Sequence, residues 1–548
     1  MLSYLILTPM AIGSMGGVVG FKRLARVMAA SSLGLFGWCL FLATGPAQSV
    51  QWRYMTLLGY AVQIHWQTNQ LADWMALLTT LINLCAQVYS LGYFRDDSRQ
   101  GYFQSILLGF TGAMLCTVFG QNLLTEFVGW ELMGVGSYLL VGYFRSQPTA
   151  RYAASKAMLV TRLGDIFFLF AVGLSVITQQ NTIMDINRQG TPFLAWALVI
   201  AVAAKSAQGP TASWLLDAMA GPTPASALIH AATMVAAGPY LLIQYYPLLE
   251  HTPGVLPTLF ILGAGTAAIA ALGALGARES KRLLAFSTVS QLGMMLMALG
   301  LGSPQTAWSL LVAHAFYKAL LFFTTGLASH RAQSGLLPKL AGQLNSFEFS
   351  TLFIVGALGV SGLPPTGGFI AKEALYHIAQ GSPTILGIDM LLSLLGGAYT
   401  ARLVKAIGVP RHHRPLSLAM WVPAVVLSGL VLANFAWHPW VMTSSISLVA
   451  AWPSLAAVCT GAIIGVMWTK PFGVCSGTSF RVLWQALQVA KSLVERMDQG
   501  VVYGISGIVT AIRGMTRIVH WGGSGRAQRY VLLSGILLAL FVIWSSHT

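Results

Sequence analysis

The sequence has 548 residues, of which 56% are hydrophobic and only 8% are charged, with a formal net charge of +16. Soluble domains carry about 25% charged residues, so this composition excludes an ordinary soluble protein and predicts an all-α polytopic membrane protein. A strongly basic chain can bind nucleic acid. The distribution of the charges, described below, indicates membrane topology instead, and we expect no nucleic-acid partner.

Apolar segments of membrane-spanning length follow one another almost from end to end. A helix needs about 20 apolar residues to span the hydrocarbon core of a bilayer. The first segment is long enough to span and lacks a small-residue cleavage site, so we expect a retained helix rather than a signal peptide. The sequence predicts about sixteen spans, near residues 2–20, 28–46, 71–93, 102–119, 122–143, 157–178, 193–209, 222–246, 255–276, 283–301, 304–329, 347–379, 385–407, 416–434, 448–468 and 529–545.

Basic residues alternate between the two sets of loops that connect these segments. They gather in the odd-to-even loops, for example at Arg278, Lys281 and Arg282 after the ninth segment. The opposite loops hold little beyond Arg53 and Arg188. By the positive-inside rule, the odd-to-even loops lie in the cytoplasm and the N-terminus lies outside. We therefore expect a multi-pass protein of the cell membrane, with a bacterial inner membrane as the expected location.

Two of the predicted helices are interrupted. One apolar run reaches Lys205 and then breaks at Gly209-Pro210, and another breaks at Pro364-Pro365 before Lys372. Proline and glycine at membrane depth free backbone groups, which is tolerated only against protein or a water-lined cavity. Simple kinks for packing are the alternative. Broken helices at corresponding positions in two halves are typical of inverted repeats around an ion path, and here five-helix units would match.

The C-terminal segment has a different pattern. From about 479 to 521 charged residues such as Lys491 and Arg496 interleave with apolar ones, which predicts a lateral helix along the membrane surface. A last span follows, near 530–544. The expected regions are N-terminal transmembrane helices at 1–100, a first repeat at 101–246, a second repeat at 247–410, additional helices at 411–478, and the lateral helix with the final span at 479–548.

Several ionisable residues lie inside or beside apolar segments. They are Glu131, Lys205, Lys318 and Lys372. A lysine at the centre of a membrane helix costs about 2.5–3.5 kcal/mol on translocon scales. A membrane protein that keeps several such groups is most simply interpreted as moving charge, in the first place protons, through itself. The alternative, a structural scaffold with vestigial charges, is disfavoured because all four residues are present.

The sequence carries no pattern for a bound cofactor or metal. Its five cysteines form no CxxC pair and mostly fall in apolar segments, so we expect small core side chains rather than ligands of zinc or an iron–sulfur cluster. No glycine-rich phosphate loop follows a strand, and the sequence offers no convincing strands. We therefore expect no cofactor on this chain, and nucleotide or flavin chemistry would take place on another polypeptide.

Five strings carry a resemblance to a known family: Gly129–Gly142 around Glu131, Lys205–Gln208, Trp214–Gly238 with its Pro-Thr-Pro and His-Ala-Ala-Thr-Met parts, Ser287–Gln291, and His314–Leu320. Together they closely resemble the antiporter-like L subunit of respiratory complex I, with more distant similarity to the Mrp cation/proton antiporters. The resemblance is strongest over about residues 70–410. The stretch from Met497 to Tyr530 resembles the lateral helix and final span of the same subunit.

The resemblance implies roles for the residues of the first repeat. Glu131 and Lys205 would form the buried acid–base pair of the entrance half. A nearby opposite charge favours the charged form of each group, whereas burial favours the neutral form. A proton that moves along the path can therefore switch their pairing. Arg162 and Asp165, three residues apart, share a helix face and would set the electrostatics around that pair. The alternative for them is a static ion pair within one helix.

The resemblance also implies roles in the second repeat. Lys318 would be the central proton carrier and Lys372 the exit group, because lysine can lose and regain a proton when it is buried. His230 and His314 would bridge them, since imidazole can pass protons at either nitrogen. Each histidine has helix–helix hydrogen bonding as its alternative role. Glu373, next to Lys372, is a candidate counter-charge.

The chain departs from the family pattern at three points. The family usually has a second histidine one turn before the position of His314, where this chain has Leu310. After Gln208 the family has a bulky residue and Pro-Leu, where this chain has Gly209–Ala212. The region before the lateral helix is also shortened. Glu126, five residues before Glu131, is expected on another face and near a helix end.

These features predict a non-redox, proton-translocating membrane subunit of an NADH:quinone oxidoreductase-type complex. Its partners would be the other membrane subunits of the complex, the lipid bilayer and the translocated H⁺, with Na⁺ as the alternative ion. Redox energy would come from partner subunits. The alternative is the same fold in another energy-coupled assembly, namely inorganic-carbon uptake, a membrane hydrogenase or an Mrp-type cation/proton antiporter.

Overall fold

The protein is described by a computed structural model in which the chain divides into two units, Met1–Val494 and Glu495–Thr548. The described residues are 2–16, 22–57, 60–180, 182–341, 343–344, 347–407, 417–436 and 451–467, with the single helical residues 492, 496, 499, 500 and 503. The predicted lateral helix and final span therefore lie almost entirely outside the described residues. All elements below belong to the first unit.

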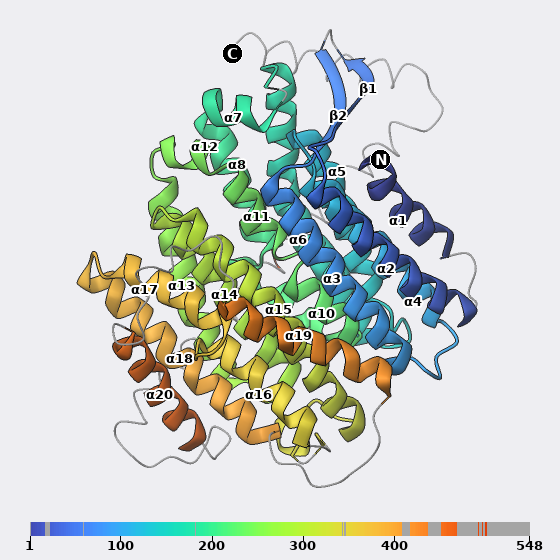
Figure 1. The fold of residues 1–548 in the computed structure, drawn as a ribbon. Helices are drawn as coiled ribbons and strands as arrows, with labels where there is room; N and C mark the ends of the chain where they lie inside the picture. The colour runs from blue at the N-terminus through green and yellow to red at the C-terminus, as the bar shows by residue number, and fades with distance from the viewer. Residues whose placement is uncertain are drawn as a thin grey trace. The chain divides into compact units, whose positions relative to one another are not determined.

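The described part of the first unit is almost entirely helical (Figure 1). Ten of its helices are long and apolar enough to cross a membrane, and three shorter apolar helices accompany them. The prediction of an α-helical polytopic membrane protein is confirmed. Each predicted apolar segment except the last coincides with a helix or with a pair of helices.

The helices of the N-terminal part are α1 (Leu2–Gly16), α2 (Lys22–Thr44), α3 (Gln70–Tyr93), α4 (Gln100–Val118), α5 (Leu123–Val141) and α6 (Pro148–Ile177). The middle part contains α7 (Ile183–Gln189), α8 (Pro192–Lys205), η1 (Gly209–Ala212), α9 (Ser213–Asp217), η2 (Ala218–Ala220), α10 (Thr223–Ala231), α11 (Ala237–Gln244) and α12 (Tyr246–His251). The remaining helices are α13 (Val255–Gly276), α14 (Ser280–Gly300), α15 (Pro304–Ala332), η3 (Leu337–Lys339), α16 (Phe347–Ser361), α17 (Gly367–Ala379), α18 (Pro383–Ile407), α19 (Leu418–Ala436) and α20 (Trp452–Met467).

Local sequence explains where several of these helices begin. The side chain of Asn69 accepts the backbone N–H of Ala72 at the start of α3, and Asn122 accepts that of Thr125 at the start of α5. These bonds satisfy N–H groups that have no partner within the helix. The helices α6, α8 and α15 begin with proline, whose missing N–H costs nothing in the first turn.

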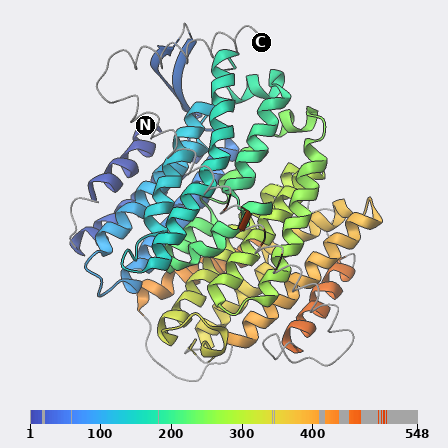
Figure 2. The same cartoon turned by 180° about the vertical axis from the view of Figure 1, so that it is seen from behind.

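One sequence expectation is wrong, because the chain does contain strands. Strands β1 (Ser49–Leu57) and β2 (Tyr60–Gln67) form an antiparallel hairpin between α2 and α3. In β2, apolar Val62, Ile64 and Trp66 alternate with polar residues, which is a strand pattern. This short alternating pattern was overlooked because it lies between two long apolar segments. The hairpin lies at the same end of the first unit as α7 and α12 in two opposite views (Figure 1 and Figure 2).

Three membrane-depth segments are interrupted, one more than predicted. As expected, α8 ends at Lys205, and α16 and α17 are separated by a break in which Gly362 has a φ of +79°. The segment predicted as one span at 222–246 is also divided, because α10 ends at Ala231 and α11 begins at Ala237. Interruptions inside a membrane protein expose backbone groups that can bind ions or water.

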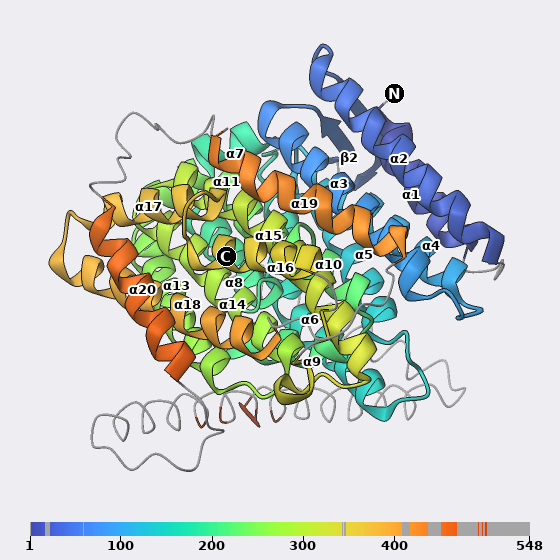
Figure 3. The ribbon, with the colours of Figure 1, turned by 60° about the horizontal axis from the view of Figure 1, so that its bottom comes forward.

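Helix α15 lies at the centre of the packing around these breaks. It contacts α14, α16, α10, α17 and α19, and Figure 3 shows it near the middle of the labelled helices. Small residues allow close helix approach, for example between α13 and α14, where a Cβ on Gly263 would meet the carbonyl oxygen of Gly293 at 2.5 Å. The buried faces of α10, α14 and α15 carry the central part of the candidate site.

Candidate functional site

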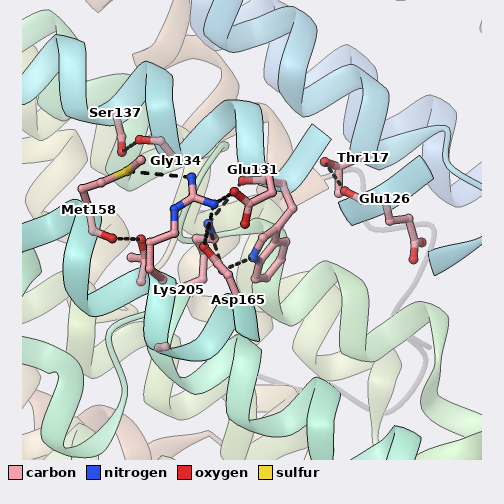
Figure 4. Close-up of polar contacts among 12 residues, drawn as sticks. Thr117, Glu126, Glu131, Gly134, Ser137, Met158, Asp165 and Lys205 are labelled. Carbon is pink, nitrogen blue, oxygen red and sulfur yellow. Dashed lines mark hydrogen bonds and ion pairs between the residues drawn. The ribbon is translucent and has the colours of Figure 1, made fainter. Parts of the chain in front are cut away.

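The first cluster of charges joins α5, α6 and α8 (Figure 4). Lys205, the last residue of α8, is fully buried, and its Nζ lies 3.3 Å from Oδ1 of Asp165. The same ammonium group donates to the carbonyl oxygen of Trp130 at 3.2 Å. The Trp130 indole N–H in turn donates to Asp165 at 2.6 Å. Asp165 is therefore the direct acid partner of Lys205.

Glu131 forms its ion pair with Arg162, and the expected pairing with Lys205 is corrected in this respect. Arg162 also lies 3.9 Å from Asp165, which follows it by three residues on the same face of α6. The four side chains thus form a row of alternating charge, Glu131, Arg162, Asp165 and Lys205. The first two side chains are partly exposed, at 22% and 31%, and the last two are buried, at 3% and 0%.

A glycine leaves room between the two cations of this row. A Cβ on Gly134 would lie 3.4 Å from Nη2 of Arg162 and 3.6 Å from Nζ of Lys205. Both cations therefore approach the same point on α5. Arg162 can serve either Glu131 or Asp165, and this makes the pairing of the row exchangeable.

Lys318 forms the second cluster, on α15. Its side chain is fully buried, and Nζ donates to the hydroxyl of Ser287 and lies 3.5 Å from the carbonyl oxygen of Leu284 on α14. Among the ion pairs of the described residues, none involves Lys318. A buried ammonium group without a carboxylate partner is costly, so its presence indicates a functional role rather than a stabilising one.

The two histidines lie beside Lys318. Nε2 of His314, one turn before Lys318 on α15, lies 3.0 Å from the carbonyl oxygen of His230. His230 occupies the last turn of α10, beside the unpredicted break, and neither of its ring nitrogens has a hydrogen-bond partner within the described residues. Its ring packs against Phe322. Leu310, which stands where the family has a second histidine, is buried, and His314 contacts the backbone of His230 directly.

A polar bridge that was not predicted extends from α15 to α18. The hydroxyl of Tyr317 donates to Oε1 of Gln291 at 3.1 Å, and Nε2 of Gln291 donates to the hydroxyl of Tyr399 at 3.4 Å. All three side chains are buried. Gln291 lay within a motif noted in the sequence, whereas the two tyrosines gave no signal that distinguished them from ordinary core residues.

Lys372 occupies the third cluster, at the break between α16 and α17. Its Nζ donates to the carbonyl oxygens of Val360 and Ser361 at 2.8 and 3.1 Å. These carbonyls end α16, where they lack partners within the helix and where the helix dipole favours a cation. A Cβ at Gly362 would meet the Lys372 side chain at 2.6 Å, so the lysine needs this glycine.

The acid beside Lys372 in the sequence is not its ion-pair partner in the described residues. Glu373 accepts a hydrogen bond from Ser454 at 2.8 Å and lies 3.9 Å from Nε2 of His377. Asp389, buried on α18, instead acts electrostatically on Lys372. Its Oδ1 has no hydrogen-bond partner within the described residues. Sequence reasoning missed Asp389, although an acid inside a predicted span was an available signal.

Glu126 lies apart from the other acids. It is in the first turn of α5 and points away from Glu131, as the sequence predicted for its face and its position near a helix end (Figure 4). The side chain is nevertheless fully buried, and it accepts a hydrogen bond from the hydroxyl of Tyr245 at 2.8 Å. This burial was not expected.

A polar cavity of about 770 Å³ opens at the end of the helices opposite the hairpin. Its lining includes Asp217, Lys281 and His330, and it reaches Thr223 and Gly326 in the helices that carry His230 and Lys318. Lys281 donates to the carbonyl oxygen of Gly221 at 3.1 Å, and Lys156 pairs with Asp217 at 2.7 Å. Water in this cavity can approach the central cluster from one side.

Comparison with known proteins places these clusters within a matched region. The protein family described as NADH:quinone oxidoreductase/Mrp antiporter, TM, matches residues 120–396. The chain is 34% identical over 448 residues to NADH-quinone oxidoreductase subunit L of Pseudomonas aeruginosa, covering 76% of this chain and 72% of that protein. It is 36% identical over 371 residues to NADH-ubiquinone oxidoreductase chain 5 of Candida albicans, covering 63% and 67%.

Two solved structures share the fold. The Mrp complex from Dietzia sp. gives a TM-score of 0.72 at 23% identity, covering 100% of this chain and 63% of that chain. The membrane-bound sulfane sulfur reductase, an archaeal respiratory membrane complex, gives 0.69 at 17% identity, covering 85% and 97%. The alignments to the curated relatives span between 57% and 72% of the relatives' lengths.

Proposed function

The chain belongs to the NADH:quinone oxidoreductase/Mrp antiporter family, and we propose that it is a non-redox, proton-translocating membrane subunit of an NADH:quinone oxidoreductase-type complex. The observation that carries this proposal is the series of three buried lysines, Lys205, Lys318 and Lys372. Two of them lie at helix interruptions, and one has no carboxylate partner in the described part of the chain. Such a series is costly in a membrane, and ionisable residues kept at this depth mark ion pathways and proton relays.

In the first cluster, the proposal assigns a switching role to Arg162. Arg162 lies within ion-pair distance of both Glu131 and Asp165. Protonation of Glu131 removes one of its partners, and Arg162 then competes with Lys205 for Asp165. This competition removes part of the attraction that holds the Lys205 ammonium and favours proton transfer towards the central cluster.

In the central cluster, the proposal assigns proton transfer to Lys318 and the two histidines. Neutral imidazole can accept a proton at one nitrogen and give one up at the other. The free ring nitrogens of His230 can face ordered water, which bridges groups that do not touch directly. The charges of Lys318 and Lys372 act on each other, so a proton that arrives at Lys318 favours release from Lys372.

The proposed topology places the basic loops and the polar cavity in the cytoplasm and the hairpin outside. The basic residues Lys281 and Arg282 line the cavity, whereas the hairpin end has few basic residues, which agrees with the positive-inside rule. The proposed repeats, 101–246 and 247–410, each contain one of the predicted breaks, after α8 and between α16 and α17. A bacterial inner membrane is the proposed location.

The proposed partners are other membrane subunits and the lipid bilayer. The curated relatives are named as subunits or chains of oxidoreductases, and the two structural neighbours are complexes. Partner subunits would carry the redox chemistry, and this chain would receive the energy through its buried charges. The transported ion is H⁺.

The second candidate is ion movement in a different energy-coupled complex. The structural match to the Mrp complex covers the whole of this chain, which favours cation/proton antiport as the form of this alternative. Inorganic-carbon uptake and a membrane hydrogenase are two further forms of this alternative, in which the same fold would serve another assembly. Sodium flux separates antiport from redox-driven pumping.

The test uses sealed membrane vesicles from cells that express the chain with its native partner subunits. NADH is added as the electron donor, and an internal pH dye and radioactive sodium report the two ions. We expect NADH-driven proton uptake that is lost in Lys372→Ala and kept in Lys339→Ala, which changes an exposed lysine. Uptake that needs no NADH and exchanges with sodium would instead support the second candidate.

A further inference from the structure

The buried acid Glu126 is not used by the path described above. Its side chain has no exposed surface, and Oε2 accepts one hydrogen bond, from Tyr245 directly after α11, at 2.8 Å. Its other oxygen, Oε1, is buried without a hydrogen-bond partner within the described residues. None of the described ion pairs includes Glu126. An unpaired acceptor at this depth is unfavourable, so the position calls for an explanation.

The hairpin covers the loop between α4 and α5, and Glu126 lies in the first turn of α5 directly after this loop. Four hydrogen bonds connect β2 to the loop between α4 and α5 and to the first turn of α5. Two of them involve the His65 backbone, whose N–H donates to the Thr125 hydroxyl at 2.9 Å and whose carbonyl accepts from the Gln121 N–H at 2.9 Å. In the other two, the Gln67 N–H donates to the Phe119 carbonyl at 2.9 Å and the Asn122 side chain donates to the Gln63 carbonyl at 3.0 Å. The acid is therefore separated from the aqueous phase on this side by an ordered two-stranded cover.

The loop sequence provides the space that the acid occupies. A Cβ at Gly120 would lie 2.6 Å from Cγ of Glu126, and Gly120 also forms an isolated bridge with Trp66 of β2. Gly120 thus lets the strand and the acid side chain approach each other closely. The arrangement is a built pocket for a carboxyl group beneath the hairpin.

The titratable groups that act on this pocket come from the α11 region and from α3. Tyr240 lies on α11, Tyr245 directly follows it, and Asp73 lies in the first turn of α3. His65, on β2, is joined to the pocket through its backbone N–H, which donates to the hydroxyl of Thr125 beside Glu126. The Tyr240 hydroxyl is committed to the carbonyl oxygen of Val118 at 2.8 Å. His65 is buried, and its Nδ1 has no partner within the described residues. Burial lowers the pKa of His65 below its ordinary 6.5, so its ring is neutral near pH 7.

We propose that Glu126 is a proton-binding group that exchanges protons with the aqueous phase on the hairpin side of the membrane, and that Tyr245 positions its carboxyl group. The inference rests on the proposed function. It adds to that function a proton-binding site on the hairpin side, separate from Lys372. The proton binds Oε1, the oxygen that has no partner among the described residues, while Oε2 keeps its bond from Tyr245. The route to water is assigned to the hairpin, in which the backbone of His65 bonds to Thr125 beside Glu126.

The test measures the rate of proton transport against pH on the hairpin side, in sealed vesicles of both orientations that contain the chain with its native partners. In the wild type we expect the rate to follow the titration of a single group. Glu126→Gln should remove that dependence and lower the rate, whereas Glu126→Asp and Tyr245→Phe should keep it with a shifted midpoint. Glu250→Gln, which changes an exposed acid on α12, is the matched control and should behave as wild type.

A purely structural role gives a different result, because the amide oxygen of glutamine also accepts the Tyr245 hydrogen bond. If Glu126→Gln transports with the wild-type pH profile, the inference is overturned while the proposed function stands. If the wild type transports no protons, the proposed function fails. In that case infrared spectroscopy tests the inference separately. The carboxyl band that Glu126→Gln removes should still change with pH on the hairpin side, and a band that does not respond overturns the inference.

Discussion

Asp165 on α6 lies 3.3 Å from the ammonium group of Lys205 at the end of α8, and both side chains are buried. This pair is the innermost part of the charge row that ends at Glu131. Because Arg162 contacts both acids of the row, a change at the more exposed end can reach Lys205 without any movement of the backbone.

Asp165→Asn should therefore be one of the most harmful single substitutions in the first cluster. It leaves the Lys205 ammonium buried without its acid, and breaking a buried pair in this way costs about 3–5 kcal/mol. We expect a lower thermal unfolding midpoint in detergent and no proton transport. The double variant Asp165→Leu, Lys205→Leu should recover the unfolding midpoint but not transport. Recovery of transport in the double variant would show that this pair is structural.

Glu131→Gln should impair transport severely, and Glu131→Asp only partly. The amide keeps the shape of the side chain but loses the charge that holds Arg162 away from Asp165. The shorter carboxylate keeps the charge at a less favourable distance. Initial rates of proton uptake in vesicles with matched protein content compare the two variants. Equal rates in both would contradict the switching role of the Glu131 charge.

Asp389→Asn should slow proton release more than Glu373→Gln does. Asp389 is the acid that acts electrostatically on Lys372, whereas Glu373 is occupied by Ser454 and lies near His377. Loss of the Asp389 charge leaves the Lys372 ammonium held only by the carbonyls at the end of α16. The measurement is the pH dependence of the transport rate, which should change in Asp389→Asn and stay close to wild type in Glu373→Gln. The reverse order would return the counter-charge role to Glu373.

Leu310→His should be tolerated and should leave transport unchanged or faster, because it adds a second imidazole to a polar path. His314→Ala should be much more harmful, since His314 alone contacts the His230 carbonyl from α15 among the described side chains. Restoring transport in the double variant Leu310→His, His314→Ala would indicate that one imidazole on this face is sufficient. Normal transport in His314→Ala alone would mean that the path avoids this face of α15.

The helices and two of their breaks could be predicted because they depend on local sequence. Apolar runs, Gly209-Pro210 and Pro364-Pro365 act through the backbone of their own segment. The break between α10 and α11 occurs at Ala232–Ala236, which contains neither proline nor glycine. Gly238 and Pro239 follow directly in the first turn of α11, and proline is disfavoured inside a continuous helix, so a breaker signal was present in the sequence but was not used.

The partners of the charged residues were harder to predict than their identities. Spacing correctly placed Arg162 and Asp165 on one face of α6, since both lie on the same helix. Which acid faces Lys205 depends on the rotation of α5 and α6 about their axes, and a single sequence carries no information on that rotation. The same limit explains why Asp389 and the bridge from Tyr317 to Tyr399 were missed.

Proton transport by Lys318 variants tests the central claim most directly. Lys318→Ala should reduce the rate by about 100-fold or more, a magnitude typical of removing a positioned proton-transfer group, while the protein remains in the membrane in normal amount. Lys318→Arg should fail as well, because a guanidinium group stays protonated at any accessible pH. Near-wild-type proton uptake by Lys318→Ala in sealed vesicles, at normal expression, would contradict the account.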